Sequence, residues 1–489
     1  MTLLSGCGWG LNLGGCRTGQ FSVQSVTPSA ATFKGGTELV LDGCGFSSHA
    51  QVLLGALSCP VSSASASRLT CVTPAGSVGA VAVTVTNGQS TTTLDNGFAY
   101  ETIAYAPGQN GMVAYAIHPT FHTLSQIGVT PNVPCSSAGG YNCLVQMGNY
   151  FYALDGQNSS TIFILSAVPG TGVLEPTAQS PFLIARSLSW SDSLLVDPLS
   201  QWLYLEAMDS ASGIESLFTL NQAPSTGALS WGASNWHYLY DPFMSPPLFT
   251  HDDKVLFGNG WDISFANPLT AGIVTGSFPN SSAGVTYSGP AAALNQVTPG
   301  GPYYYGGGLE AGKAYVTQSS FNTSTNSWTQ IGSGAIALAA STFEPATLSL
   351  SQDAQYLYAV VQPTLPLYVF SVSNGAGTYG QLTLTPTTYS LGATEAGFDP
   401  TGKYLLVITL SQVLSMQYNS TNGALTQVAA APFTGAYASS FVQFSWDFTG
   451  TTVFAGTQGF YFNPQTGTLT SLIGSANPLT ALSNIIIGF

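Results

Sequence analysis

A tight-turn sequence followed by an aromatic-rich strand recurs downstream of residue 101, and no other feature of the chain constrains its fold as strongly. In its fullest form the turn reads Asp399-Pro400-Thr401-Gly402. The Asp side chain can accept a hydrogen bond from the backbone two residues on, Pro presets φ, and Gly supplies the left-handed residue that closes the turn. Each copy therefore predicts a β-hairpin. Clear copies are Phe398–Val407, Val196–Leu205 and Ser351–Val360, and weaker ones are Trp446–Phe454 and His251–Phe257.

A second turn, centred on glycine and rich in Thr, Ser and Asn, follows the first in several units. We interpret it as the hairpin between the third and the outermost strand of each unit. Two hairpins per unit imply four antiparallel strands, which is the blade of a β-propeller. The second turn occurs at Pro169–Leu174, Ser225–Leu229, Thr421–Leu425 and Gln465–Leu469.

The spacing of the first turn predicts the number of blades. Its Asp residues stand at positions 197, 253, 353, 399 and 447, which leaves intervals of 56, 100, 46 and 48 residues. The interval of 100 predicts one degenerate unit near residues 303–327, and His118-Pro119 can take the Asp-Pro position of a first unit. We therefore expect a seven-bladed β-propeller over residues 102–489, with the run Ile485–Ile487 as a closing strand.

Charged side chains are scarce, and this scarcity excludes several classes of protein. Lys and Arg number 7 and Asp and Glu 21, together 6% of 489 residues, where soluble proteins carry roughly 25%. A net charge of -14 leaves no basic patch for a row of phosphates, so we expect no nucleic-acid partner. Polar residues interrupt every apolar stretch before the ~18 residues of a membrane helix. The abundance of Gly, Thr, Ser, Val and Tyr predicts an all-β fold.

Residues 21–101 contain short strands separated by turns, as in a β-sandwich. The segments that carry this pattern are Val26-Thr27-Pro28, Gly35-Gly36-Thr37, Gly43-Cys44-Gly45-Phe46, Val52–Gly55, Cys71–Ala75, Val81–Val85 and Phe98-Ala99-Tyr100. In this order they resemble an IPT/TIG domain, an immunoglobulin-like module. The resemblance implies a spacer or binding module on a bacterial surface protein. We therefore divide the chain into a flexible Gly/Cys-rich tail (1–20), this sandwich (21–101) and the propeller (102–489).

The seven cysteines all lie in the first third of the chain and lack the spacing of a metal site. Disulfides are the better interpretation, and they predict an extracytoplasmic protein, secreted or on the cell surface. The IPT/TIG resemblance implies a bridge between Cys59 and Cys71. The remaining expected pairs are Cys16–Cys44, which would pin the tail to the sandwich, and Cys135–Cys143, which would staple a loop.

Cys7 is then the unpaired cysteine, and it ends the run Leu4-Ser5-Gly6-Cys7. This run resembles the lipobox of bacterial lipoproteins, which implies lipidation of Cys7 and a lipid anchor. Only six residues precede Cys7, without the charged and apolar regions of a signal peptide. A short flexible Gly-rich tail is the alternative interpretation.

The Asp-Pro-x-Gly-Lys-Tyr-Leu repeat resembles the YVTN and lactonase-like group of seven-bladed propellers. The resemblance implies a fold and leaves the activity open, because this repeat occurs in enzymes and in plain surface proteins alike.

The innermost strand of each blade lines the channel of a propeller, so its polar residues are the natural candidates for a site. Glu395 is the ionisable member of this set, and the alternative role for it is a solvated residue bonded to neighbouring backbone amides. Gln443 is a second candidate for ligand binding. The aligned positions, four residues before the turn, are Ser193, Leu248, Ser349, Glu395 and Gln443.

An aromatic cluster is the other candidate. Trp236, His237, Tyr238 and Asp241 fall in what the spacing predicts to be a long loop, and together they could stack a sugar ring. A packed loop is the alternative. We find no G-x-S-x-G motif, no metal-ligand spacing and no cofactor signature, and we expect neither a metal nor a cofactor.

These observations support three hypotheses for function. The first is an extracytoplasmic, surface-anchored binding or structural protein whose propeller contacts a glycan, a surface protein or a neighbouring copy. The second is a lactonase-like or carbohydrate-processing hydrolase that uses Glu395 and His237. The third is a subunit that self-assembles into sheets or filaments, because low charge weakens repulsion between copies, although the net charge of -14 opposes it.

Overall fold

The fold is taken from a computed structural model that describes most of the chain. The described residues are 16, 19–108, 110–135, 143–155, 161–184, 188–197, 202–209, 214–238, 248–249, 255–257, 261–265, 274–279, 281–282, 285–286, 292–322, 325, 327–341, 345–361, 366–433, 444–456, 458–474 and 486–487. Their regular elements are all β-strands, so the all-β class is confirmed. Over these residues no helix is long and apolar enough to cross a membrane.

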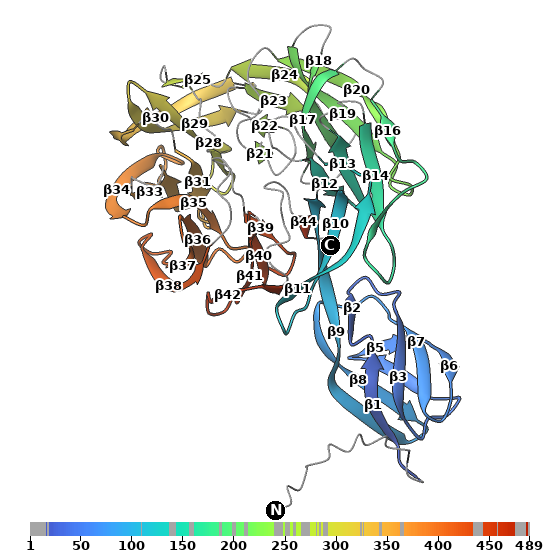
Figure 1. Ribbon diagram of the computed structural model, residues 1–489. Coiled ribbons are helices and arrows are strands. Elements are labelled where there is room, and N and C mark those ends of the chain that lie inside the picture. Colours follow the sequence, from blue (N-terminus) through green and yellow to red (C-terminus); the bar gives the residue numbers. More distant parts are fainter. Residues whose placement is uncertain are drawn as a thin grey trace, which may run out of the picture. The chain divides into compact units, whose positions relative to one another are not determined.

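The chain divides into two compact units, and the main boundary falls between Thr102 and Ile103. In the first unit one sheet has the strand order β1-β3-β7-β6 and a second has the order β9-β8-β4-β5, with β2 parallel to β9 (Figure 1). These strands are β1 (Ser22–Thr27), β2 (Ala30–Thr32), β3 (Glu38–Cys44), β4 (Gln51–Leu54), β5 (Leu57–Cys59), β6 (Val61–Ala64), β7 (Arg68–Val72), β8 (Gly79–Asn87) and β9 (Ser90–Gly108).

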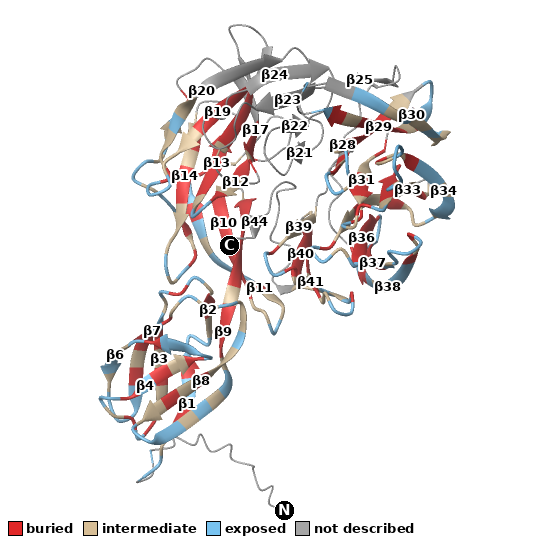
Figure 2. Ribbon diagram, turned by 180° about the vertical axis from the view of Figure 1, so that it is seen from behind, coloured by how far each residue is buried: buried red, intermediate tan, exposed pale blue. Residues whose placement is uncertain are grey.

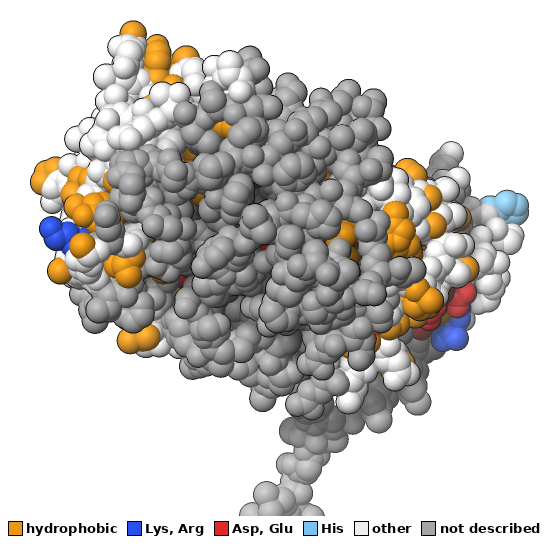
Figure 3. Space-filling model, turned by 90° about the horizontal axis from the view of Figure 1, so that it is seen from above, with side chains coloured by type: hydrophobic (Ala, Val, Ile, Leu, Met, Phe, Trp, Pro, Cys, Tyr) orange, Lys and Arg blue, Asp and Glu red, His pale blue; other side chains and the backbone are white. Residues whose placement is uncertain are grey.

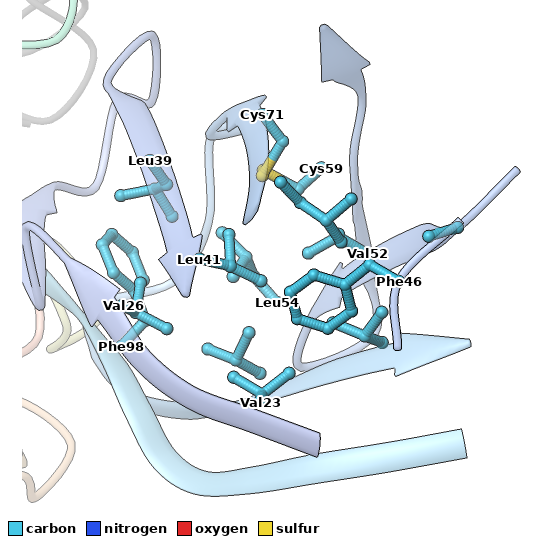
Figure 4. Packing of buried hydrophobic residues seen from close by; sticks show 14 of the residues in the cluster. Val23, Val26, Leu39, Leu41, Phe46, Val52, Leu54, Cys59, Cys71 and Phe98 are labelled. Atoms are coloured by element: carbon cyan, nitrogen blue, oxygen red, sulfur yellow. A yellow bond between two sulfur atoms is a disulfide. The ribbon is translucent and has the colours of Figure 1, made fainter. Parts of the chain in front are cut away.

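The core of this sandwich follows the two-residue period of its strands. Leu39 and Leu41 of β3 and Val83 and Val85 of β8 are fully buried, while the residues between them are more exposed. Figure 4 shows Leu39 and Leu41 among the apolar side chains of this core, with the disulfide between Cys59 and Cys71 beside them. The first unit is therefore a β-sandwich with an apolar interior.

The described residues contain three disulfides, and they are the three pairs expected in the sequence analysis. They are Cys16–Cys44, Cys59–Cys71 and Cys135–Cys143, with Cα–Cα distances of 5.4, 5.6 and 5.3 Å. Cys7 lies outside the described residues.

The described residues of the second unit form a succession of antiparallel sheets (Figure 1). The first contains β44, β9, β10 and β11, and β43 pairs with the outer edge of β11. The next seven sheets are β12–β15 with β16, β17–β20, β21–β24, β27–β30, β31–β34, β35–β38 and β39–β42, and β25 pairs with β26 alone.

The strands of the first half of this unit are β10 (Gly111–Ile117), β11 (Thr123–Pro131), β12 (Leu144–Met147), β13 (Tyr150–Asp155), β14 (Thr161–Ala167), β15 (Leu174–Pro176), β16 (Phe182–Leu183), β17 (Leu188–Val196), β18 (Trp202–Asp209), β19 (Ile214–Gln222), β20 (Leu229–Tyr238), β21 (Leu248–Phe249), β22 (Val255–Phe257), β23 (Trp261–Phe265), β24 (Val274–Pro279), β25 (Ser281–Ser282) and β26 (Val285–Thr286).

Those of the second half are β27 (Ala292–Asn295), β28 (Tyr303–Glu310), β29 (Lys313–Asn322), β30 (Ser327–Ala340), β31 (Thr347–Leu350), β32 (Tyr356–Val360), β33 (Leu367–Val372), β34 (Leu382–Tyr389), β35 (Ala393–Phe398), β36 (Tyr404–Thr409), β37 (Gln412–Tyr418), β38 (Leu425–Pro432), β39 (Phe444–Trp446), β40 (Thr452–Ala455), β41 (Gln458–Phe462), β42 (Leu469–Ser471), β43 (Ile473–Gly474) and β44 (Ile486–Ile487).

The first strands of several successive sheets lie side by side. β12 contacts β17, β27 contacts β31, β31 contacts β35, and β44 contacts both β12 and β39. β44 is the predicted closing strand, and it pairs with the first sheet through Ile486 opposite Tyr105 and Ile487 opposite Ala104. The second unit is therefore a β-propeller whose innermost strand of the first blade comes from the C-terminal segment.

The expected number of seven blades is wrong, because the described strands build eight blade sheets. The interval before Asp197 contains two blades, whereas the turn motif indicated only one. Blade β12–β15 lacks the motif, since its first hairpin is closed by Gly148 and Asn149 with Gly148 at φ +59°. His118-Pro119 follows β10 and lies in the turn between the third and fourth strands of its blade, not in the first turn.

Several neighbouring blades are in contact through the tyrosine that begins the second strand of one blade. The ring of each such Tyr packs on a left-handed glycine in the hairpin between the third and fourth strands of the next blade, so that a Cβ there would overlap the ring. The pairs are Tyr150 with Gly227, Tyr303 with Gly380, Tyr356 with Gly423 and Tyr404 with Gly467. This contact explains the second recurring turn, because the turn needs a residue with positive φ and without a side chain. Figure 2 shows that burial decreases toward outer strands such as β34 and β38.

Candidate functional site

The carboxylates of the aspartates in the blade turns accept hydrogen bonds from backbone amides. Asp399 is buried; its Oδ1 accepts a hydrogen bond from the amide of Tyr404 at 2.7 Å, and its Oδ2 accepts one from Thr401 at 3.0 Å. Asp447 accepts from the amide of Thr452 at 2.9 Å in the same way. These hydrogen bonds close the hairpins, so we assign both carboxylates a structural role.

Blade β31–β34 closes its turn with a serine. The Oγ of Ser351 accepts a hydrogen bond from the amide of Tyr356 at 3.0 Å, five residues on, as Asp399 does for Tyr404. Asp353 accepts hydrogen bonds from the Ser351 hydroxyl at 2.6 Å, from the Gln355 amide at 3.2 Å and from the Tyr418 hydroxyl at 3.0 Å. The residue equivalent to Asp399 is therefore Ser351, two positions earlier than the predicted alignment.

This correction changes which residue of that blade is equivalent to Glu395. Counting four residues back from Ser351 gives Thr347, not the predicted Ser349. The hydroxyl of Thr347 in β31 donates a hydrogen bond to Oε1 of Glu395 in β35 at 2.6 Å. Two equivalent positions of neighbouring blades thus contact each other directly. We call Thr347 and Glu395 the inner pair.

The surroundings of Glu395 disfavour its charged form. The residue is half-buried, and burial of the carboxyl raises its pKa to about 8, although hydrogen bonds from Thr347 and the Ala396 amide act in the opposite direction. The next contact between the two blades is also polar, since the hydroxyl of Ser349 donates to the carbonyl of Ala396 at 2.7 Å. At neutral pH the inner pair consists mainly of a protonated carboxyl and a hydroxyl.

The aromatic cluster is not in a loop. Trp236, His237 and Tyr238 belong to β20, where His237 pairs with Ser216 of β19. Successive residues of a strand belong to opposite faces of the sheet, so His237 is not on the same face as the other two. The side chains of these three residues, and Asp241 and Gln443 as a whole, lie outside the described residues.

The structure does not bring Glu395 and His237 together. Glu395 lies on the innermost strand of blade β35–β38, whereas His237 lies on the outermost strand of blade β17–β20. The catalytic pair of the hydrolase hypothesis therefore has no geometric support. Over the described residues, no group of three His, Cys, Asp or Glu side chains could hold a metal ion.

Glu206 is a buried acid that the sequence reasoning missed. It lies opposite Ser193 in the pairing of β17 with β18, and its Oε2 accepts a hydrogen bond from the Ser193 hydroxyl at 2.7 Å. The side chain is fully buried. The sequence could have indicated this residue, because Glu206 lies across the predicted hairpin from Ser193, a candidate residue of the inner strand.

Comparison with known proteins identifies the first unit. Residues 22–100 match the IPT/TIG domain family, as the sequence resemblance predicts. A stretch of 81 residues is 33% identical to Fibrocystin-L of Homo sapiens. That match covers 17% of this chain and only 2% of the human protein.

Solved structures similar to the chain include the periplasmic gluconolactonase PpgL of Pseudomonas aeruginosa, at 16% identity and a TM-score of 0.48, over 71% of this chain and 99% of that one. A protein from Lactobacillus plantarum is 17% identical over 68% of this chain and 95% of its own, with a TM-score of 0.45. The Dos1 propeller is 11% identical over 67% and 82%, also with a TM-score of 0.45. Because these identities and TM-scores are low, we base the propeller assignment on the order of the sheets. We draw no conclusion about activity from these structures.

Proposed function

We propose that the protein is an extracytoplasmic binding protein whose propeller binds a neutral glycan at its inner strands, with the IPT/TIG domain as a spacer. The observation that carries this proposal is that the polar groups of the turns and those of the inner strands have different hydrogen-bond partners. The turn acids are bonded to backbone amides, whereas the inner pair of Thr347 and Glu395 combines a hydroxyl with a half-buried carboxyl. Such a pair suits hydrogen bonding to an uncharged ligand.

Two features support the extracytoplasmic location. Disulfides persist in oxidising compartments, and this chain carries three of them in its first 143 residues. Lipidation of Cys7 and attachment to a cell surface follow from the lipobox resemblance and stay predictions.

The charge of the surface supports a neutral partner. Lys and Arg total 7 in the whole chain against 21 acidic residues. Figure 3 shows that the described side chains on one face include few charged groups. An acidic polysaccharide would meet a protein of the same sign, so a neutral glycan is the better partner.

Hydrolysis by Glu395 is the second candidate function. A carboxyl with a pKa of about 8 could act as a general acid near neutral pH. Hydrolysis also needs a base or nucleophile, and within the described part of the chain no other ionisable group influences the pKa of Glu395. We therefore favour binding.

Self-assembly through the outer strands is opposed by their sequence. β34 contains Pro386 and β38 ends at Pro432, and proline has no N–H to offer a neighbouring strand. Both strands also carry a register shift against their inner neighbour. These features protect sheet edges from pairing with other copies.

The proposed function is tested by applying the full chain to an array of immobilised oligosaccharides that includes neutral and acidic members. We expect saturable binding to at least one neutral oligosaccharide, and competition by the same sugar free in solution. Binding confined to acidic sugars, or no binding at all, would contradict the proposal.

A further inference from the structure

The carboxyl of Glu395 has hydrogen-bonding capacity that its neighbours among the described residues do not use. A carboxyl group offers about four acceptor sites when ionised, and one donor with several acceptor sites when protonated. The donors that reach it are the hydroxyl of Thr347 and the amide of Ala396. The residue as a whole is of intermediate exposure, although its carboxyl lies in a desolvated setting.

Among the described residues, no charged group is recorded against this carboxyl. The described strands packed against β35 include β31, β32, β36 and β39. β31 contributes Thr347 and Ser349, β36 places Ile408 opposite Glu395, and β39 contributes Phe444. None of these four side chains is ionisable. Burial and the two hydrogen bonds are the influences on its pKa, which is raised to about 8. Below that pH the protonated carboxyl can donate one hydrogen bond and accept others.

We propose that the inner pair recognises a hydroxyl group of a neutral saccharide, with the carboxyl of Glu395 in its protonated form donating to the sugar oxygen and Thr347 holding Oε1 in place. This inference rests on the proposed function and assigns it a specificity residue. A metal ion or a cationic ligand would require the ionised carboxyl, whereas an anionic sugar would be disfavoured as soon as the carboxyl lost its proton.

The inference predicts a distinction between two substitutions of Glu395. Glu395→Gln keeps a donor and an acceptor of nearly the same shape, so it imitates the protonated carboxyl. Glu395→Ala removes both. A hydrogen bond to a ligand contributes on the order of 1 kcal/mol, which corresponds to about a fivefold to tenfold change in affinity.

The test is calorimetric titration of the intact protein with the neutral oligosaccharide that binds most tightly on the array, at pH values from 6 to 9.5. We expect Glu395→Gln to bind within about threefold of wild type, and Glu395→Ala to bind about tenfold more weakly. Wild-type affinity should fall above pH 8, whereas that of Glu395→Gln should stay constant. Ser349→Ala is the matched control, because it weakens the same contact between blades without touching the carboxyl.

Circular dichroism of each variant separates a loss of binding from a loss of structure. If Glu395→Gln binds as weakly as Glu395→Ala, or if wild-type affinity does not change with pH, the protonated carboxyl is not the recognition group. If all variants bind like wild type, saccharide binding stands and the site lies elsewhere. If no neutral oligosaccharide binds wild type, the proposed function itself fails.

Discussion

The contact between tyrosine and glycine of adjacent blades makes a sharp prediction for Gly423→Ala. Gly423 has φ +69° in the hairpin between β37 and β38, and a Cβ there would lie 2.6 Å from Cε1 and 2.9 Å from Cγ of Tyr356. Both atoms are members of the aromatic ring, so the whole ring would have to move to make room for the Cβ. The ring cannot turn away freely, because its hydroxyl donates a hydrogen bond to the carbonyl of Thr421 at 3.1 Å.

The expected cost has two parts. An L-residue in the left-handed region costs roughly 1 kcal/mol, and forcing a methyl group into a packed contact costs typically about 1 to 3 kcal/mol more. We therefore expect Gly423→Ala to lower the free energy of unfolding by about 3 kcal/mol. Gly377→Ala is the matched control: Gly377 also has positive φ, at +83°, but no atom lies within 4 Å of its would-be Cβ. It should lose only about 1 kcal/mol.

Urea unfolding followed by tryptophan fluorescence measures both variants, and the midpoints are compared at unchanged slope. The difference between them isolates the contact with Tyr356 from the backbone strain that they share. Equal losses in the two variants, or a loss below 1 kcal/mol for Gly423→Ala, would refute the proposed lock between blades.

Three further predictions concern single groups. Asp399→Ala should cost about 2 to 4 kcal/mol in urea unfolding, because it leaves buried amides without an acceptor, whereas Asp353→Ala, at a half-buried turn, should cost less. Replacing Cys59 and Cys71 by serine should cost about 3 kcal/mol in urea unfolding, and alkylation of the wild type without reductant should leave the six disulfide-bonded cysteines unlabelled. Because the pKa of Glu395 is raised to about 8 in the folded state, melting temperature should fall as pH rises from about 5 to 8, and Glu395→Gln should flatten this trend.

The fold was largely predictable because turn chemistry is local. Asp399, Pro400 and Gly402 specify one hairpin, and the glycine turns specify the next, so strand order follows without knowledge of distant contacts. The missed blade shows where this reasoning fails. Gly148 and Asn149 close a hairpin equally well without any Asp, so a motif search cannot see it.

The site was predictable in part. The position of Glu395 on an inner strand followed from counting along one blade. Its partner did not, because Thr347 lies 48 residues away and belongs to a blade whose turn uses Ser351 in place of Asp. The raised pKa arises from packing between blades, and no local pattern records that packing.

The most direct test of the central claim, that the inner-strand carboxyl binds and does not catalyse, is the hydrolysis rate of a panel of sugar lactones with the wild type and with Glu395→Gln. We expect neither protein to exceed the uncatalysed rate for any lactone between pH 6 and 9. Turnover by the wild type that Glu395→Gln abolishes would contradict this account and establish Glu395 as a catalytic residue.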